Sequence, residues 1–143
     1  MRKVVAATAV LLGAFACGST TSQFVGVWQL SSGSQIVTCG SQMTTIQLSG
    51  SETIASGSVS GTISVTTSNC NEVFQVASDD TSATANNQTC PVELNGTAAI
   101  FDITSDSLTR SGSVLSEAAS GSLVSGGQTC SVVQSSAATR VDN

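Results

Sequence analysis

The chain has 143 residues, enough for one domain, and only 9% of them are charged and 3% aromatic. Beyond Arg2 and Lys3 it carries two Arg against nine Asp and Glu, a balance that repels nucleic acid and excludes nucleic-acid binding. Ser, Thr and Gly dominate the remainder, which disfavours helices and suits short strands joined by tight turns.

Residues 1–16 have the pattern of a secretory signal peptide. A basic start precedes an apolar run from Val4 to Phe15, which is too short to span a bilayer permanently. Ala14-Phe15-Ala16 before Cys17 fits ordinary cleavage and secretion. The same residues also resemble a bacterial lipobox, in which Cys17 becomes the lipidated first residue of the mature protein, although lipoboxes usually carry Leu where Ala14 stands.

Cysteine parity favours lipidation of Cys17. The chain has five Cys, and acylation of one leaves the even number expected in an exported protein. Gly18 after the Cys resembles lipoproteins sent to the outer membrane. We therefore expect a palmitate-bearing envelope lipoprotein with residues 17–23 as a flexible tether, the alternative being a secreted or periplasmic protein.

Residues 24–143 are predicted to form one β-domain. Its first strand is Phe24 to Leu30, which holds Trp28, the only Trp of the chain. Asn95-Gly96 predicts a two-residue hairpin turn, and Gly126-Gly127 predicts a second one. Ser31 to Ser34 is also interpreted as a turn. Further strand segments are predicted at 35–39, 43–48, 59–66, 70–77, 83–90, 92–94, 97–103, 108–110, 114–117, 122–125, 128–133 and 137–141, the last as an edge strand.

This spacing gives eight to ten strands and predicts an all-β fold. We expect an antiparallel β-meander that closes into a small barrel, with a β-sandwich as the alternative. A turn centred on Asp80 places Cys70 opposite Cys90 across one ladder, within disulfide range. Four Cys allow three pairings, and by elimination the second disulfide is then Cys39–Cys130.

The mature chain lacks the groups that most enzymes use. It has no His, Tyr or Lys, so no Ser has an imidazole or an amine to activate it, and we expect no enzymatic activity, no cofactor and no metal site. Asp79 and Asp80 are interpreted as solvated turn acids. Asp102 and Asp106 lack the spacing of a calcium loop and are interpreted as surface acids near a strand end.

Gly26-Val27-Trp28 on a first strand, followed by a meander of this length, resembles the lipocalin and wider calycin group. The resemblance implies that Trp28 packs at the closed end of a barrel and that Arg140, from the last strand, lies across it. An unrelated sheet with a core Trp on its first strand is the alternative. The leader with its Cys, the four further Cys and the Ser/Thr/Gly-rich meander also resemble small envelope lipoproteins of myxobacteria, which implies a location and no activity.

The expected function is therefore a binding or structural role at the envelope. The first specific hypothesis is a lipocalin-like, monomeric binder of a small apolar ligand, in a cavity lined by Trp28, Phe74, Phe101 and Ile63; the alternative is that these four fill a solid core. A second hypothesis is a protein-binding module. It would be either an inhibitor of an exported protease, inserting the segment from Gly18 to Gln23, or an adhesin that uses an open strand edge.

Overall fold

The computed structural model describes residues 22–141, apart from 67–69, 86 and 95. This part of the chain forms ten antiparallel strands, and none of its segments is a helix long and apolar enough to cross a bilayer. The strands are β1 (Gly26–Cys39), β2 (Gln42–Gln47), β3 (Ser51–Ser56), β4 (Thr62–Thr66), β5 (Asn71–Val76), β6 (Ser82–Ala85), β7 (Gln88–Leu94), β8 (Thr97–Ser111), β9 (Val114–Ser125) and β10 (Gln128–Arg140). The predicted leader and Cys17 lie outside the described residues.

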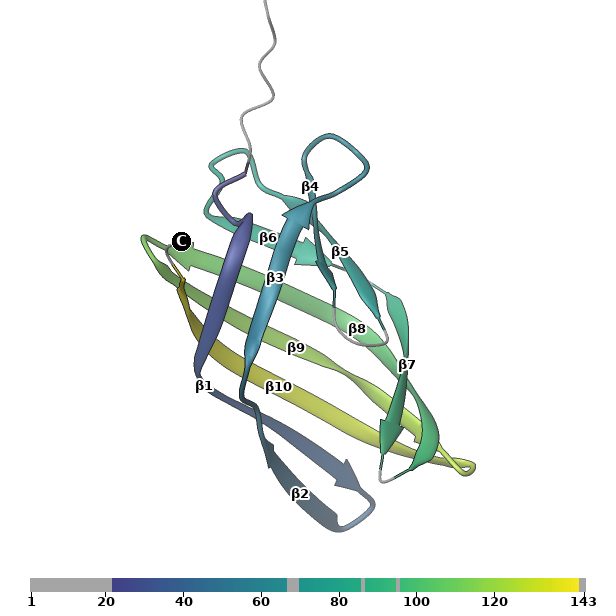
Figure 1. The fold of residues 1–143 in the computed structure, drawn as a ribbon. Helices are drawn as coiled ribbons and strands as arrows, with labels where there is room; N and C mark the ends of the chain where they lie inside the picture. Colours follow the sequence, from purple (N-terminus) through teal and green to yellow (C-terminus); the bar gives the residue numbers. More distant parts are fainter. Residues whose placement is uncertain (1–21, 67–69, 86, 95, 142–143) are drawn as a thin grey trace, which may run out of the picture.

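Eight of the strands close into an antiparallel barrel. The hydrogen-bonded path runs from β1 through β3, β4, β5, β6, β8 and β9 to β10, which pairs back with β1 (Figure 1). The closing ladder includes the pairs Trp28–Arg140 and Val37–Val132. The all-β class and the closed barrel are thus confirmed, and the sandwich alternative is wrong.

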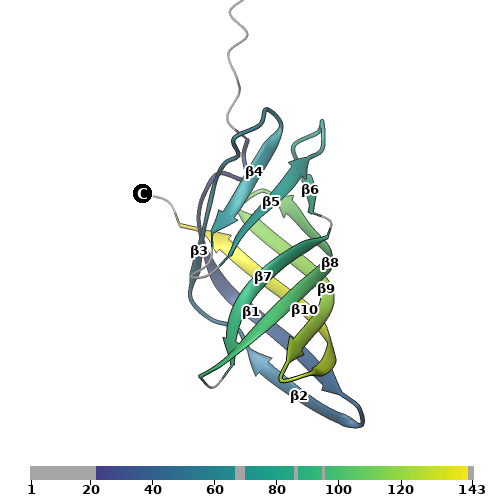
Figure 2. The same ribbon diagram turned by 90° about the vertical axis from the view of Figure 1, so that its right-hand side faces the viewer.

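The four longest strands, β1, β8, β9 and β10, extend beyond this closed part, which we call the closed tier. There β1 pairs with β2 in place of β3, and β8 pairs with β7 in place of β6. The result is a curved six-stranded sheet in the order β2-β1-β10-β9-β8-β7, which we call the open tier (Figures 1 and 2). Its edges are β2 and β7, and no pairing joins them among the described residues.

Strand β8 places side chains on the inner face of both tiers because it contains a β-bulge. The register shifts between Ile103 and Ser105, so Thr104 is the extra residue. Without it, strict alternation would turn Asp106 and Leu108 outward; with it, both follow Ile103 on the inner face and are buried. A second shift, between Leu30 and Ser32 in β1, lies where that strand changes partner from β3 to β2.

Each tier has its own apolar cluster. The closed tier is filled by Phe24, Trp28, Ile54, Ile63, Val65, Phe74, Ala83, Ala85, Leu108, Leu115 and Ala138. The open tier has a smaller cluster of Ala99, Leu123, Cys130 and Val132, with the partly buried Val37, Cys39, Val92 and Phe101 packed against it. A small barrel filled by side chains is the expected outcome for eight strands.

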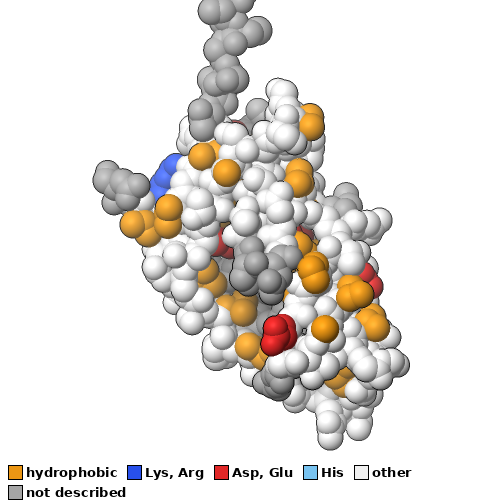
Figure 3. All heavy atoms as spheres, turned by 45° about the vertical axis from the view of Figure 1, so that its right-hand side comes forward, with side chains coloured by type: hydrophobic (Ala, Val, Ile, Leu, Met, Phe, Trp, Pro, Cys, Tyr) orange, Lys and Arg blue, Asp and Glu red, His pale blue; other side chains and the backbone are white. Residues whose placement is uncertain are grey.

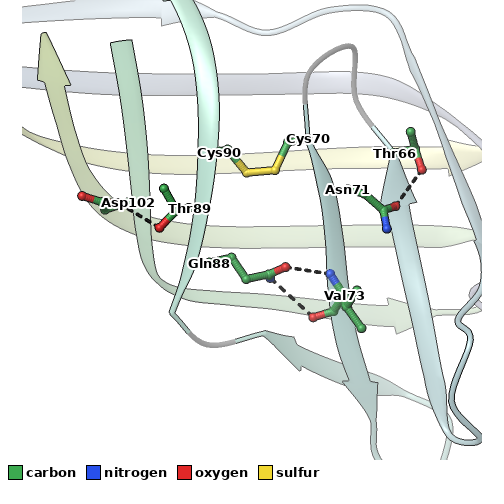
Figure 4. The surroundings of a disulfide bond; sticks show 8 residues. All are labelled: Thr66, Cys70, Asn71, Val73, Gln88, Thr89, Cys90 and Asp102. Carbon is green, nitrogen blue, oxygen red and sulfur yellow. Dashed lines mark hydrogen bonds between the residues drawn. A yellow bond between two sulfur atoms is a disulfide. The ribbon is translucent and has the colours of Figure 1, made fainter.

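Both predicted disulfides are present. Cys39–Cys130 joins β1 to β10 near the far end of the open tier, with Cα atoms 4.4 Å apart. Cys70–Cys90 joins the start of β5 to β7, with Cα atoms 5.2 Å apart (Figure 4). The second disulfide therefore ties the closed tier to an edge strand of the open tier.

The route by which Cys70 meets Cys90 differs from the prediction. The two were expected opposite each other in one hairpin, but β6 ends at Ala85 and the chain then moves to β7, where Cys90 pairs with Phe101 of β8. The ladder between β5 and β6 contains only the pairs Gln75–Thr84 and Val76–Ala83. The disulfide thus crosses between strands that are not hydrogen-bonded neighbours, which makes it a tertiary link.

Several segments that were predicted as turns or gaps between strands are continuous strand in the structure. Ser31 to Ser34 lies within β1, and β8, β9 and β10 each join two segments that were predicted separately. The segment 137–141 is not an edge: Ala138 pairs with both β1 and β9, which removes the open edge on which an adhesin was argued. Strand β3 was not predicted, and Val59, the first residue of the segment predicted at 59–66, is 64% exposed in the turn before β4.

Candidate functional site

The structure brings together three of the four residues proposed to line a cavity. Trp28, Ile63 and Phe74 belong to the closed-tier cluster, each at most 1% exposed. Phe101 is separate, partly buried in the open tier. The closed tier is thus packed by these side chains, which leaves the open tier as the part of the interior with partly exposed apolar groups.

The end of the closed tier that holds Trp28 is sealed by the N-terminal segment. Arg140 lies over the Trp28 ring, 5.5 Å from its centroid, and donates to the carbonyl oxygens of Gln23 and Val25. The Trp28 indole donates to the carbonyl of Phe24 at 2.7 Å, and Phe24 is fully buried. Entry of a ligand at this end would require this plug to leave.

The start of the described chain is also held in place. The Ser22 hydroxyl donates to Asp80 Oδ1 at 2.6 Å, and the Gln23 amide donates to Asp80 Oδ2 at 2.7 Å. Arg110 donates to the carbonyls of Asp80 and Gly112. The flexible tether was expected to run to Gln23, but its last two residues are fastened to the barrel.

Four acidic side chains gather on the inner face, where the closed tier meets the open tier. They come from four strands, and each lies two residues from a buried apolar residue on the same inner face. The pairs are Glu52 with Ile54, Glu72 with Phe74, Asp106 with Leu108, and Glu117 with Leu115. We call Glu52, Glu72, Asp106 and Glu117 the acidic cluster.

Asp106 is the most enclosed member of the cluster. It is 3% exposed, whereas Glu52, Glu72 and Glu117 are partly exposed. Its carboxyl group shares a hydrogen bond with that of Glu72, which requires one of the two to carry a proton. Asp106 is therefore wrongly interpreted as a surface acid, because the bulge in β8 turns it inward. Asp102, on the same strand, accepts a hydrogen bond from Thr89 at 3.0 Å.

Neutral donors from β10 and β1 surround Glu117. The Ser136 hydroxyl donates to Glu117 Oε2 at 2.8 Å, and the Gln134 amide donates to Glu117 Oε1 at 3.2 Å. Gln35 in turn donates to Gln134 Oε1 at 3.2 Å. Two other carboxylate oxygens, Glu52 Oε1 and Asp106 Oδ1, are buried without a hydrogen-bond partner among the described residues.

The cluster holds protons that ordinary carboxyl groups release. Burial, then repulsion by Glu117 and Glu72, raises the pKa of Glu52 to about 7. Burial, then the charge of Glu117 and the hydrogen bond with Glu72, raises the pKa of Asp106 to about 9. Burial likewise raises the pKa of Glu72. No basic side chain of the described residues contributes to these pKa shifts.

The disulfide Cys70–Cys90 borders the cluster. A carboxylate oxygen of Glu72 lies within 4.8 Å of both sulfur atoms. This trio has the residue types of a metal site, but its sulfurs are bonded to each other and supply no thiolate. Beside it, the Gln88 side chain of β7 bonds both the amide and the carbonyl of Val73 in β5, so this edge of β5 is covered (Figure 4).

In the open tier, beyond the acidic cluster, the inner face is apolar. It presents Val37, Phe101 and Val92 around the buried Val132 and Leu123. Figure 3 shows a recess in this side of the molecule, with acidic atoms inside it and hydrophobic atoms along it. A carboxylate group and an apolar wall therefore share one concave surface.

Two further hollows lie at the surface of the open tier. One, of about 360 Å³, is lined mainly by Ser and Gly residues of β1 and β10 beside the register shift in β1. The other, of about 370 Å³, is lined by Pro91, Val92, Glu93, Gly96 and Ala98 at the end of the β7–β8 hairpin. Neither contains a member of the acidic cluster.

Comparisons with protein-family models, with curated proteins and with solved structures returned no match for this chain. The candidate site therefore rests on its own geometry. Of these four acids only Asp106 was considered from the sequence, as a surface acid, and Glu52, Glu72 and Glu117 were not singled out. Their positions could have indicated an inner-face location, since each acid lies two residues from an apolar residue that is buried, and residues two apart on a strand share a face.

Proposed function

We propose that this protein is a non-enzymatic, exported binding protein, anchored to the cell envelope through a lipid on Cys17. Its ligand is a small molecule with an apolar part, held on the inner face of the open tier. The observation that carries the proposal is the division of the barrel into a packed, plugged closed tier and an open tier in which Val37, Val92 and Phe101 of the inner face are only partly buried.

The arrangement at the plugged end supports a lipocalin-like organisation. Gly26-Val27-Trp28 begins β1, and Arg140 from the last strand crosses Trp28. In a barrel of this kind one end is closed by packing and the other admits the ligand. The two disulfides are typical of proteins outside the reducing cytosol, in agreement with export.

The anchor is tested by fractionation. Cys17→Ala should release the protein from detergent-extractable membrane into the soluble fraction. A variant that stays with the membrane would exclude the lipid on Cys17 as the anchor.

Binding is tested by native mass spectrometry of the exported Cys17→Ala protein after incubation with a detergent-free extract of its own envelope. A retained mass of a few hundred daltons supports the proposal. A bare protein refutes it, and a protein-sized adduct refutes it in favour of the protease inhibitor or adhesin.

Two substitutions locate the site. Phe101→Ala removes a partly buried ring from the inner face of the open tier and should weaken retention of the small mass. Its neighbour Ile100 is 47% exposed on the outer face, so Ile100→Ala is the matched control and should retain the ligand. Equal retention by both variants would place the ligand elsewhere.

A further inference from the structure

The acidic cluster carries an excess of negative charge for which the barrel supplies no counter-charge. Of the four basic residues of the chain, Arg2 and Lys3 precede the described part, while Arg110 and Arg140 donate to backbone carbonyls at the plugged end. Buried carboxylates are costly unless they are paired or protonated. The empty protein meets this cost by keeping protons, and a cation from outside would meet it better.

Two oxygen atoms show where a donor is missing. Asp106, 3% exposed, leaves Oδ1 without a partner, and Glu52 leaves Oε1 without one among the described residues. When the two carboxyl groups are ionised both oxygens are acceptors, and the partner that suits them is then a donor. Glu52, Glu72 and Glu117 are partly exposed, so the cluster is accessible to a ligand from solvent.

The spacing of the acids disfavours a metal ion as that cation. Calcium needs six to eight oxygens at about 2.3–2.6 Å, which places ligand atoms close to one another. Within the described residues, Cys70, Glu72 and Cys90 are the single set of three such groups whose ligand atoms all lie within 4.8 Å, and two of these are disulfide sulfurs. An ammonium group carries three donors and no acceptor, and it can serve carboxylates that are further apart.

The apolar face below the cluster specifies the rest of the ligand. Phe101, Val37 and Val92 are partly exposed there, so a hydrocarbon or aromatic body can cover them. We infer that the site binds a primary organic amine, its ammonium group among the carboxyl groups of the acidic cluster and its apolar body along the inner face of the open tier. This inference rests on the proposed function, of which it names the ligand class.

Binding of such a cation must be linked to proton release. The titratable groups that face the site are Glu52 from β3, Glu72 from β5, Asp106 from β8 and Glu117 from β9; the polar residues bonded around them, from β10 and β1, are neutral. An ammonium group favours the ionised carboxylates, so affinity should rise with pH from about 6 to about 9, and protons should be released on binding.

The test is calorimetric titration of the exported, disulfide-intact Cys17→Ala protein at pH 8. The probes are octylamine and 2-phenylethylamine, with 1-octanol as the uncharged partner and calcium chloride as the metal. The expected result is that at least one amine binds at least tenfold more tightly than octanol, with protons released, and that calcium does not compete.

The outcomes separate this inference from the proposed function. Equal binding of amine and octanol would keep an apolar site and overturn the inference. Binding of no organic probe would overturn the inference together with the proposal on which it rests. Competition by calcium would overturn the inference in favour of a metal site.

Two variants connect the effect to the cluster. Asp106→Asn and Glu52→Gln replace the two acids by amides of the same shape, so the fold is expected to survive. Each should weaken amine binding at least tenfold and reduce the number of protons released. Glu93→Gln, at an exposed acid on β7, is the control and should change neither quantity. Unchanged amine affinity in both cluster variants would overturn the inference.

Discussion

Neutralising Glu52 should stabilise the protein, and only at high pH. Its pKa is raised from 4.5 to about 7 in the folded protein. Between these two values the folded protein holds a proton that the unfolded chain has released. Folding is therefore penalised progressively as pH rises from about 4.5 to about 7, and the full penalty remains above that range.

The size of the effect follows from this difference in pKa. A pKa difference of about 2.5, at about 1.36 kcal/mol for each pKa unit, gives about 3.4 kcal/mol. Because the side chain is partly exposed and solvent screens it, we expect about 2–3 kcal/mol. Glu52→Gln removes this penalty, because an amide has the shape of the protonated acid and does not titrate.

The assay is urea unfolding of the disulfide-intact protein at pH 4.5, 6, 7 and 8.5, followed by the fluorescence of Trp28. Glu52→Gln should match the wild type at pH 4.5 and exceed its free energy of unfolding by about 2–3 kcal/mol at pH 8.5. Glu93→Gln, at an exposed acid, should follow the wild type throughout. A Glu52→Gln variant that gains nothing between pH 4.5 and 8.5 would refute the placement of this acid in a poorly solvated cluster.

Three further predictions concern the scaffold. Replacing Cys39 and Cys130 together by Ser should lower the free energy of unfolding, measured in urea, by about 4–5 kcal/mol, because the disulfide closes a loop of 91 residues. Gly121→Ala should lower the melting temperature sharply, since its Cβ would collide with the carbonyl oxygen of Asp102 in β8; normal melting would show that the two strands can separate there. Arg140→Ala should lower the free energy of unfolding by about 2 kcal/mol and shift the fluorescence emission of Trp28 to longer wavelength. Arg140→Lys should lower the free energy of unfolding less; equal losses would argue against stacking on the indole.

The features that the sequence predicted depend on local chemistry. Strands β7 and β8 pair from Leu94 and Thr97 onward with Gly96 at positive φ, as the hairpin prediction requires, although Asn95 lies outside the described residues; Gly126-Gly127, both at positive φ, joins β9 to β10. Each of these turns is specified by two adjacent residues. The disulfide pairing was also predicted correctly, although the ladder from which Cys70–Cys90 was predicted was wrong; Cys39–Cys130 followed from it by elimination.

The lengths of the strands could not be predicted from the same signals. Ser-Ser-Gly-Ser at 31–34 has the composition of a turn, yet it pairs with β10 and continues β1 across the bulge. In a chain this rich in Ser and Gly, turn residues also occur within strands, and only the partner strand decides between the two. Strand β3 was missed for the same reason, since Ser51 and Ser56 bound it.

The acidic cluster was hidden because its members are far apart in the sequence. Glu52 and Glu117 are 65 positions apart, and nothing local connects them. Asp106 depends in addition on the extra residue Thr104, which no alternation pattern contains. The sequence did indicate which face each acid occupies, because an acid two positions from a large apolar residue of a predicted strand lies on the same face as that residue.

The same strands that bring the acids together also keep them from moving apart. Repulsion among the carboxylates acts to separate β3, β5, β8 and β9, and a loosely held barrel would relax by opening. Here β5 begins at the Cys70–Cys90 disulfide, two residues before Glu72, and Gln88 of β7 bonds its backbone at Val73. The closed tier fixes the other ends of these strands through its packed apolar cluster. Because β5 is held at both ends, its Glu72 cannot easily move away from the other acids; the repulsion appears as retained protons, and retained protons are what a cationic ligand can displace.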